Sequence, residues 1–243
     1  MGQKTALVTG GTGTIGTEIC RQLCQAGHRV VATCLPAEAE AAQDWQATQK
    51  AAGFEIEIVA CDLADFDATA AAVTQAGAVD VLVNVAGITR DASLRKMTPA
   101  QWHEVIQSNL DSVFNATRNV IEGMLERGFG RVISISSING QKGQFGQANY
   151  AASKAGIHGF TMSLAQEGAR KGVTANTVSP GYIESPMVNA VPEEVRKQII
   201  AQIPVARLGR PADIARVVVF LAAEESGFIT GANIPVNGGH YMS

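Results

Sequence analysis

The sequence contains no apolar run that approaches the ~18 residues needed for a membrane-spanning helix. It also lacks an excess of positive charge, because its formal net charge is −3. Neither nucleic acid nor an anionic membrane surface is therefore expected as a partner. A strand-like apolar segment begins at Thr5, which leaves no room for a secretory signal peptide. We expect a cytoplasmic protein.

Cysteine and histidine are also scarce, with four of each in the chain. The cysteines lie inside apolar segments and lack paired C-x-x-C spacing, and Cys20 and Cys24 have the i,i+4 spacing of ordinary helix packing. No set of residues has the spacing of metal ligands. We predict a reduced protein with no metal cofactor.

Apolar residues, by contrast, are abundant, at 46% of the chain. They form seven runs rich in β-branched residues, at 5–10, 29–34, 55–63, 79–87, 131–137, 174–181 and 233–239. Their hydrophobicity is continuous rather than alternating, which is typical of strands buried on both faces of a parallel sheet. Segments with helical spacing separate the runs. We predict a single α/β domain over residues 1–243, a Rossmann-like doubly wound parallel sheet of about seven strands with helices on both faces.

Polar or glycine-rich segments follow five of these predicted strands: "TGGTGTIG", "CDL", "NVAG", "SSING" and "SPGYIESPM". Ligands of open α/β sheets bind beyond the carboxyl ends of the strands. The five segments therefore predict one binding site, in which the N-terminal part of the domain holds a cofactor and the C-terminal part carries catalysis and substrate.

The first of these segments can be interpreted in two registers. Gly11, Gly13 and Gly16 fit the general dinucleotide pattern G-x-G-x-x-G, whereas counting from Thr9 nearly gives T-G-x-x-x-G-x-G, with Thr14 in place of a glycine. Either register predicts a pyrophosphate at a helix N-terminus, although a tight turn without a ligand is the alternative. Thr14 is tolerable if its φ stays negative, and we expect Gly13 to supply the lost flexibility.

The residues after the second predicted strand bear on the cofactor. Glu38 lies 22 residues beyond Gly16, where an acid contacts the ribose hydroxyls of NAD, and no Lys or Arg lies between Arg29 and Lys50. This favours NADH over NADPH. Glu38 could equally lie on the solvated start of a helix.

The segment "YAASK" places Tyr150 and Lys154 on one helix face. A nearby ammonium favours a phenolate, so we expect the lysine to lower the tyrosine pKa and make Tyr150 a proton donor to an alkoxide. Ser137, at the end of a predicted strand, could bond the substrate carbonyl.

Together with "SNLDSVF" and "ITGANIPVNGG", these motifs resemble the classical short-chain dehydrogenases/reductases over essentially the whole chain. The resemblance implies catalytic roles for Ser137, Tyr150 and Lys154, with Asn109 holding a water that resupplies protons through the lysine. It also implies the following cofactor-binding residues: Gly10, Gly13, Thr14, Ile15, Gly16, Glu38, Asp62, Leu63, Asn84, Ala86, Gly87, Tyr150, Lys154, Pro180, Gly181 and Ile183.

Within this family the chain is most similar to the acetoacetyl-CoA reductases of polyhydroxybutyrate synthesis, through stretches such as "GITRDASLRKMT" and "SSINGQKGQFGQANY". This implies reduction of a 3-oxoacyl-CoA to the (R)-3-hydroxyacyl thioester. The acyl pocket would then be lined by Gln144, Phe145, Gln147, Gly181 and Tyr182, with Asp91 and Lys96 near the pantetheine or its phosphates.

Two alternatives remain open. The first is a 3-oxoacyl-acyl-carrier-protein reductase, although the stretch around Arg118 to Arg131 lacks the basic stripe that an acidic carrier needs. The second is a non-catalytic dinucleotide sensor, against which the Ser137, Tyr150 and Lys154 set argues. The resemblance also implies a homotetramer formed through helices around 99–127 and 149–170. The proline-flanked segment 185–204 is expected to be a helical lid.

Overall fold

The computed structural model describes residues 2–242 and contains one parallel sheet of seven strands in the order β3-β2-β1-β4-β5-β6-β7. The strands are β1 (Thr5–Thr9), β2 (Arg29–Cys34), β3 (Ile56–Ala60), β4 (Val81–Asn84), β5 (Gly130–Ile135), β6 (Val173–Pro180) and β7 (Asn233–Val236). Each overlaps one of the seven runs found in the sequence. The predicted doubly wound Rossmann-like domain is therefore confirmed.

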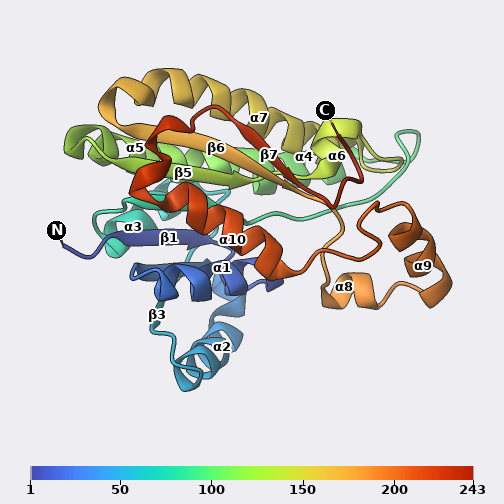
Figure 1. Ribbon diagram of the computed structural model, residues 1–243, viewed down its shortest axis with the longest axis horizontal. Helices are drawn as coiled ribbons and strands as arrows, with labels where there is room; N and C mark the ends of the chain where they lie inside the picture. Colours follow the sequence, from blue (N-terminus) through green and yellow to red (C-terminus); the bar gives the residue numbers. More distant parts are fainter. Residues whose placement is uncertain (1, 243) are drawn as a thin grey trace.

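Helices cover both faces of the sheet (Figure 1). The longer ones are α1 (Thr14–Gln25), α2 (Ala39–Ala51), α3 (Phe66–Ala76), α4 (Pro99–Ile106), α5 (Ser112–Arg127), α7 (Ala148–Gly168), α9 (Glu193–Ala201) and α10 (Pro211–Ala222). Helices α1 and α10 pack together on one face, and α3, α5 and α7 cover the other. Leu7 and Val8 of β1 are buried in opposite clusters, which is why the strands are apolar on both faces.

Short helices occupy several connections. They are η1 (Pro36–Glu38), α6 (Ile138–Lys142), η3 (Ala169–Lys171), α8 (Pro186–Asn189) and η4 (Glu224–Phe228). The expected single helix of the 185–204 segment is instead two helices, α8 and α9, which lie beside the main layers at the right of Figure 1. Pro192 is the N-cap of α9, where its lack of an N–H is harmless, and it disfavours helix at the preceding residue.

A π-helical turn, η2 (Gln107–Asp111), separates α4 from α5. The helix expected around 99–127 is thus divided into α4 and α5 by this turn. A π-turn inserted into a helix is frequently associated with a functional site.

Candidate active site

A cavity of about 910 Å³ lies where the strands end. Its wall is formed by residues that directly follow β1, β2, β3, β4, β5 and β6, together with side chains from α7. The five polar or glycine-rich segments singled out in the sequence all contribute to this wall. It therefore lies where an open α/β sheet binds its ligands.

The glycine segment turns sharply between β1 and α1. Gly10 has φ +61°, and its N–H donates to Thr33 Oγ1 at 3.2 Å. A Cβ on Gly16 would lie 2.3 Å from the Gly10 carbonyl oxygen, and a Cβ on Gly11 would lie 2.6 Å from the Cβ of Ala32. Close packing at Gly11 and Gly16 and the positive φ of Gly10 thus favour glycine at these three positions.

Gly13 and Thr14 behave differently from these three glycines. Thr14 begins α1 with a negative φ, as its tolerance required. Gly13 is the N-cap with φ −71° and ψ 171°, which any residue can adopt, so it supplies no special flexibility. That expectation is wrong, because the left-handed conformation falls on Gly10. A Cβ on Gly13 would make only an ordinary 3.4 Å contact, and the position is open toward the cavity.

Charge along the cavity wall is sparse. Among the described lining residues, Glu38, Asp62 and Lys154 are the only charged side chains. Glu38 is exposed where η1 meets α2, and Asp62 follows β3 and accepts a hydrogen bond from the Ala64 N–H at 3.0 Å. The only cation in the lining thus belongs to α7 and not to the end of β2.

The segment after β4 approaches α7 closely. A Cβ on Gly87 would lie 3.1 Å from Asn109 Oδ1 and 3.4 Å from Lys154 Nζ, so a side chain there would press on both. Asn84 lies below the cavity wall, because it is 3% exposed and donates to Ser134 Oγ at 3.2 Å. The other cofactor-binding residues named from the sequence all line the cavity.

Ser137, Tyr150 and Lys154 come together in this wall although they belong to two segments. Lys154 is 3% exposed, and its ammonium donates to the Ile135 carbonyl oxygen at 2.9 Å and lies 5.7 Å from the centre of the Tyr150 ring. Ser136 Oγ donates to the Lys154 carbonyl oxygen at 2.9 Å, which ties α7 to the end of β5.

Burial shifts the pKa of both titratable groups. It raises the pKa of Tyr150, the negative charge of Asp91 raises it further, and a hydrogen bond with Ser137 opposes the shift. The expected lowering of the Tyr150 pKa is therefore wrong, because desolvation of the phenolate dominates the shift. Burial also lowers the pKa of Lys154 to about 8.

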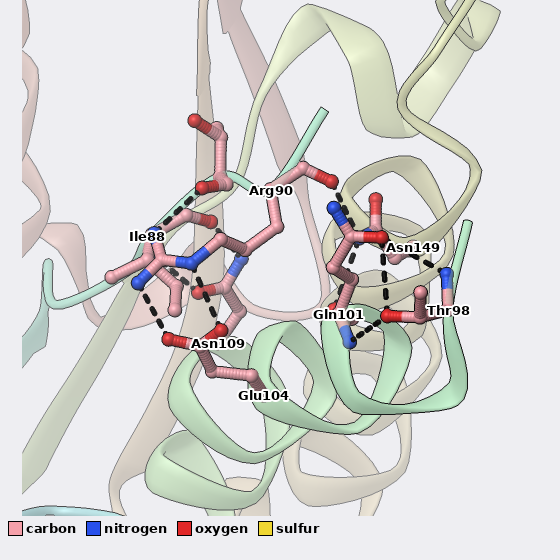
Figure 2. Close-up of polar contacts among 8 residues, drawn as sticks. Ile88, Arg90, Thr98, Gln101, Glu104, Asn109 and Asn149 are labelled. Atoms are coloured by element: carbon pink, nitrogen blue, oxygen red, sulfur yellow. Dashed lines mark hydrogen bonds and ion pairs between the residues drawn. The ribbon is translucent and has the colours of Figure 1, made fainter. Parts of the chain in front are cut away.

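Asn109 lies in the π-turn and is completely buried. Its Oδ1 accepts from the Ile88 N–H at 2.7 Å, and its Nδ2 donates to the Ile88 carbonyl oxygen at 2.9 Å (Figure 2). The same Nδ2 also donates to Ser153 Oγ at 3.2 Å. The side chain thus anchors the segment after β4. A role in holding water stays a prediction.

Two of the residues expected at the substrate site, Gln147 and Asp91, bond each other. Gln147 Nε2 donates to Asp91 Oδ2 at 2.9 Å, and Asn139 Nδ2 donates to Gln147 Oε1 at 2.8 Å. Phe145 is 89% exposed, and Tyr182 stacks on His240. Gly181 lines the cavity, whereas the other predicted substrate residues lie outside its described lining: Asp91, Lys96, Gln144, Phe145, Gln147 and Tyr182.

Sequence reasoning missed several residues of the wall. Ile88 and Thr89 follow β4, and Cys34 and Leu35 lie at the end of β2. For Ile88 and Thr89 the signal was available, because they directly follow the marked segment "NVAG"; Cys34 and Leu35 end a strand for which only Glu38 was singled out.

No group of three or more His, Cys, Asp or Glu side chains in residues 2–242 could hold a metal ion. No helix in the same range is long and apolar enough to cross a bilayer.

Comparison with known proteins gives consistent matches. A family model described as short chain dehydrogenase matches residues 4–196. The chain is 57% identical to an acetoacetyl-CoA reductase of Allochromatium vinosum, over 98% of this chain and 99% of that protein. It is 54% identical to an acetoacetyl-CoA reductase of Cupriavidus necator over the full length of both. It is 42% identical to a 3-oxoacyl-acyl-carrier-protein reductase of Vibrio cholerae, over 98% of each.

Proposed function

Because this chain belongs to the short-chain dehydrogenase family, we propose that it reduces the 3-oxo group of acetoacetyl-CoA to (R)-3-hydroxybutyryl-CoA with NADH or NADPH. The observation that carries the proposal is the meeting of Ser137, Tyr150 and Lys154 at one cavity in a protein 57% and 54% identical to two acetoacetyl-CoA reductases.

The glycine segment and the cavity fit a dinucleotide. Gly10, Gly11 and Gly16 leave the backbone bare at the N-terminus of α1, where N–H groups and the helix dipole attract a pyrophosphate. When bound, a reduced nicotinamide dinucleotide supplies the hydride. The chain's own residues bind and orient the reactants and supply the proton.

Each catalytic side chain has a distinct proposed role. Ser137 Oγ accepts a hydrogen bond from the Asn139 N–H at 3.1 Å, a contact that does not use the hydroxyl proton, and in the complex this proton is donated to the substrate carbonyl oxygen. Tyr150 then donates its phenolic proton to the forming alkoxide. Lys154 holds a positive charge beside the phenol and stabilises the phenolate left behind.

The raised pKa of Tyr150 supports the reductive direction. Burial keeps the phenol protonated near neutrality, as a general acid must be. Oxidation of a hydroxyacyl substrate needs the phenolate instead, which the same burial disfavours.

For the cofactor we propose a preference for NADH over NADPH. In the described lining of the cavity the acidic residues are Glu38 and Asp62, and the only cation, Lys154, lies on α7 and not near the end of β2. A 2′-phosphate near the end of β2 would meet the carboxylate of Glu38, whereas ribose hydroxyls can donate to it.

The carrier-protein alternative is less well supported. The three arginines of the candidate landing surface are engaged within the chain: Arg118 with Glu122 at 3.9 Å, Arg127 with Asp80 at 3.4 Å, and the buried Arg131 with backbone carbonyl oxygens. An acidic carrier binds best where basic side chains are free. The neighbouring acids and the burial of Arg131 reduce the positive charge that this surface presents, which favours CoA.

We propose a homotetramer that uses α4, α5 and α7, on which Trp102, Phe114 and Met162 are exposed apolar side chains. Light scattering on a sizing column would test the tetramer.

The four cysteines, all within residues 2–242, are free thiols, which suits a reducing cytoplasm.

The test of the function is dinucleotide oxidation by the purified protein with acetoacetyl-CoA. We expect turnover with both dinucleotides, a higher kcat/KM with NADH, and the (R) product on chiral chromatography. Turnover only with a carrier-bound thioester would favour the carrier-protein alternative. NADH binding without turnover on either substrate would favour a sensor.

A further inference from the structure

A buried amide lies directly beside the proposed proton donor. Asn149 is the second residue of α7, precedes Tyr150 and is completely buried. Its Nδ2 donates to the carbonyl oxygens of Arg90 and Gln101, each at 3.1 Å, and its Oδ1 accepts from the Tyr150 N–H at 2.8 Å. Figure 2 shows this side chain between the segment that contains Arg90 and the start of α4.

The bond to Tyr150 compensates for a missing helix cap. The first N–H groups of a helix have no partner within the helix, and the Tyr150 N–H is one of them. Within the described chain, Gln147, the N-cap of α7, makes no side-chain hydrogen bond to these groups. Asn149 Oδ1 satisfies the Tyr150 group, so the backbone of the tyrosine depends on this side chain.

The two bonds from Nδ2 reach the segment after β4 and the helix α4. Arg90 belongs to the loop of residues 85–98, whose members Ile88 and Thr89 line the cavity together with Tyr150. Asn109 holds the same loop at Ile88. Asn149 therefore provides a second anchor for the loop, and this one comes from the helix that carries the phenol.

An exposed ion pair also joins the loop to α4, but it is a weaker tie. The Arg90 guanidinium bonds both carboxylate oxygens of Glu104, and these side chains are 44% and 46% exposed. Exposed pairs contribute little, because water and salt screen them. Asn149 bonds the backbone of Arg90, so its contact does not depend on the arginine side chain.

We propose that Asn149 is a positioning residue that fixes Tyr150 relative to the loop of residues 85–98. The residue type suits the task, because one short amide offers two donors for two carbonyl oxygens and one acceptor for an N–H. A carboxylate would face both carbonyl oxygens without a proton to share. The proposal rests on the proposed role of Tyr150 as proton donor.

The test compares Asn149→Ala with the wild-type protein in the reduction of acetoacetyl-CoA. We expect kcat to fall by roughly 10- to 100-fold, because a misplaced acid is costly, while the Kd for NADH changes by less than about threefold. If Asn149 acts through the phenol, the same substitution in a Tyr150→Phe background changes kcat by less than about threefold, because coupled residues are not additive.

Asn176→Ala is the matched control. Asn176 is also buried, donates to the Ile229 carbonyl oxygen at 2.8 Å and accepts from the Ala232 N–H at 3.0 Å, away from the cavity wall. It reports the general effect of losing a buried amide that bridges backbone groups. We expect it to lower the melting temperature while kcat stays within about threefold of wild type.

Three outcomes would overturn the proposal: an unchanged kcat in Asn149→Ala, an equal loss in Asn176→Ala, or an undiminished loss in the Tyr150→Phe background. If Asn149→Ala does not fold, Asn149→Ser, which retains a short acceptor, replaces it in the same comparison.

A wild-type protein inactive on acetoacetyl-CoA would contradict the proposed function only. Amide hydrogen exchange would then decide the present inference: faster exchange in residues 85–98 and at Tyr150 of the variant supports it, and unchanged exchange overturns it.

Discussion

The Nζ atom of Lys154 lies 5.7 Å from the centre of the Tyr150 ring and donates to the Ile135 carbonyl oxygen at 2.9 Å. The ammonium of Lys154, a residue of α7, is thus also held in place by a hydrogen bond to the end of β5. A charge fixed in this way acts on the phenol without any rearrangement during the reaction.

Replacing Tyr150 by Phe removes the proposed proton donor and little else. We expect kcat for acetoacetyl-CoA to fall by about 10²- to 10⁴-fold, the usual contribution of a general acid, while NADH binds with a Kd within about threefold of wild type. Steady-state kinetics and fluorescence titration with NADH measure the two effects. Tyr241→Phe, near the C-terminus, is the control for loss of a phenol, and near-normal turnover in Tyr150→Phe would exclude Tyr150 as the acid.

The rate of reduction is expected to fall above about pH 8. Burial lowers the pKa of Lys154 to about 8, so its charge is lost there, whereas the raised pKa of Tyr150 keeps the phenol protonated. The measurement is a profile of kcat/KM against pH at constant ionic strength.

We expect the protein to stay folded through the same titration. The ordinary pKa of lysine is 10.5, so between about pH 8 and that value the unfolded chain binds more protons at this position. The contribution of Lys154 to the free energy of unfolding therefore increases with pH in this range. A circular dichroism signal that stays constant while activity falls would agree with this account, and activity that stays flat to about pH 10 would contradict it.

Two glycines of the first loop are expected to respond differently to alanine. Gly16→Ala places a Cβ 2.3 Å from the Gly10 carbonyl oxygen, and we expect a loss of about 1–3 kcal/mol in the free energy of unfolding. Gly13→Ala makes a 3.4 Å contact at φ −71°, so its stability should stay within about 0.5 kcal/mol of wild type.

Gly13→Ala is expected to weaken dinucleotide binding although it leaves stability unchanged. Gly13 is open toward the cavity, where the proposed pyrophosphate comes closest, so Gly13→Ala should raise the Kd for NADH without changing the melting temperature. Denaturant titration and NADH titration of both variants make the comparison. Unchanged affinity in Gly13→Ala would place the pyrophosphate elsewhere.

Glu38→Arg is expected to shift the cofactor preference toward NADPH. The substitution replaces a carboxylate that repels a 2′-phosphate with a guanidinium that binds it, and we expect the NADPH to NADH ratio of kcat/KM to rise about tenfold or more. Glu40→Arg makes the same charge change two residues further on, at an exposed position outside the cavity lining. An equal shift in both variants would indicate a general effect of charge and remove Glu38 from the ribose site.

Much of the site could be predicted because the fold places strand ends together. Gly16, Asp62 and Gly87 follow three different strands, and each lines the cavity once those strands pair side by side. The placement of Asn84 could not be predicted in the same way. It ends its strand too, but its side chain turns beneath the wall to Ser134, and side-chain direction at a strand end depends on the neighbouring strand.

The sequence alone determined the seven strands, the glycine turn and the spacing of Tyr150 and Lys154, because these depend on residues near one another in the chain. Only the tertiary structure decided the protonation of the phenol, the π-turn at Asn109 and the bonds of Asn149. Each of these depends on groups that are distant in sequence, namely the desolvating walls around Tyr150, the Ile88 backbone and the Arg90 carbonyl. Burial and buried hydrogen bonds exist only after the chain has folded, so no local pattern of residues encodes them directly.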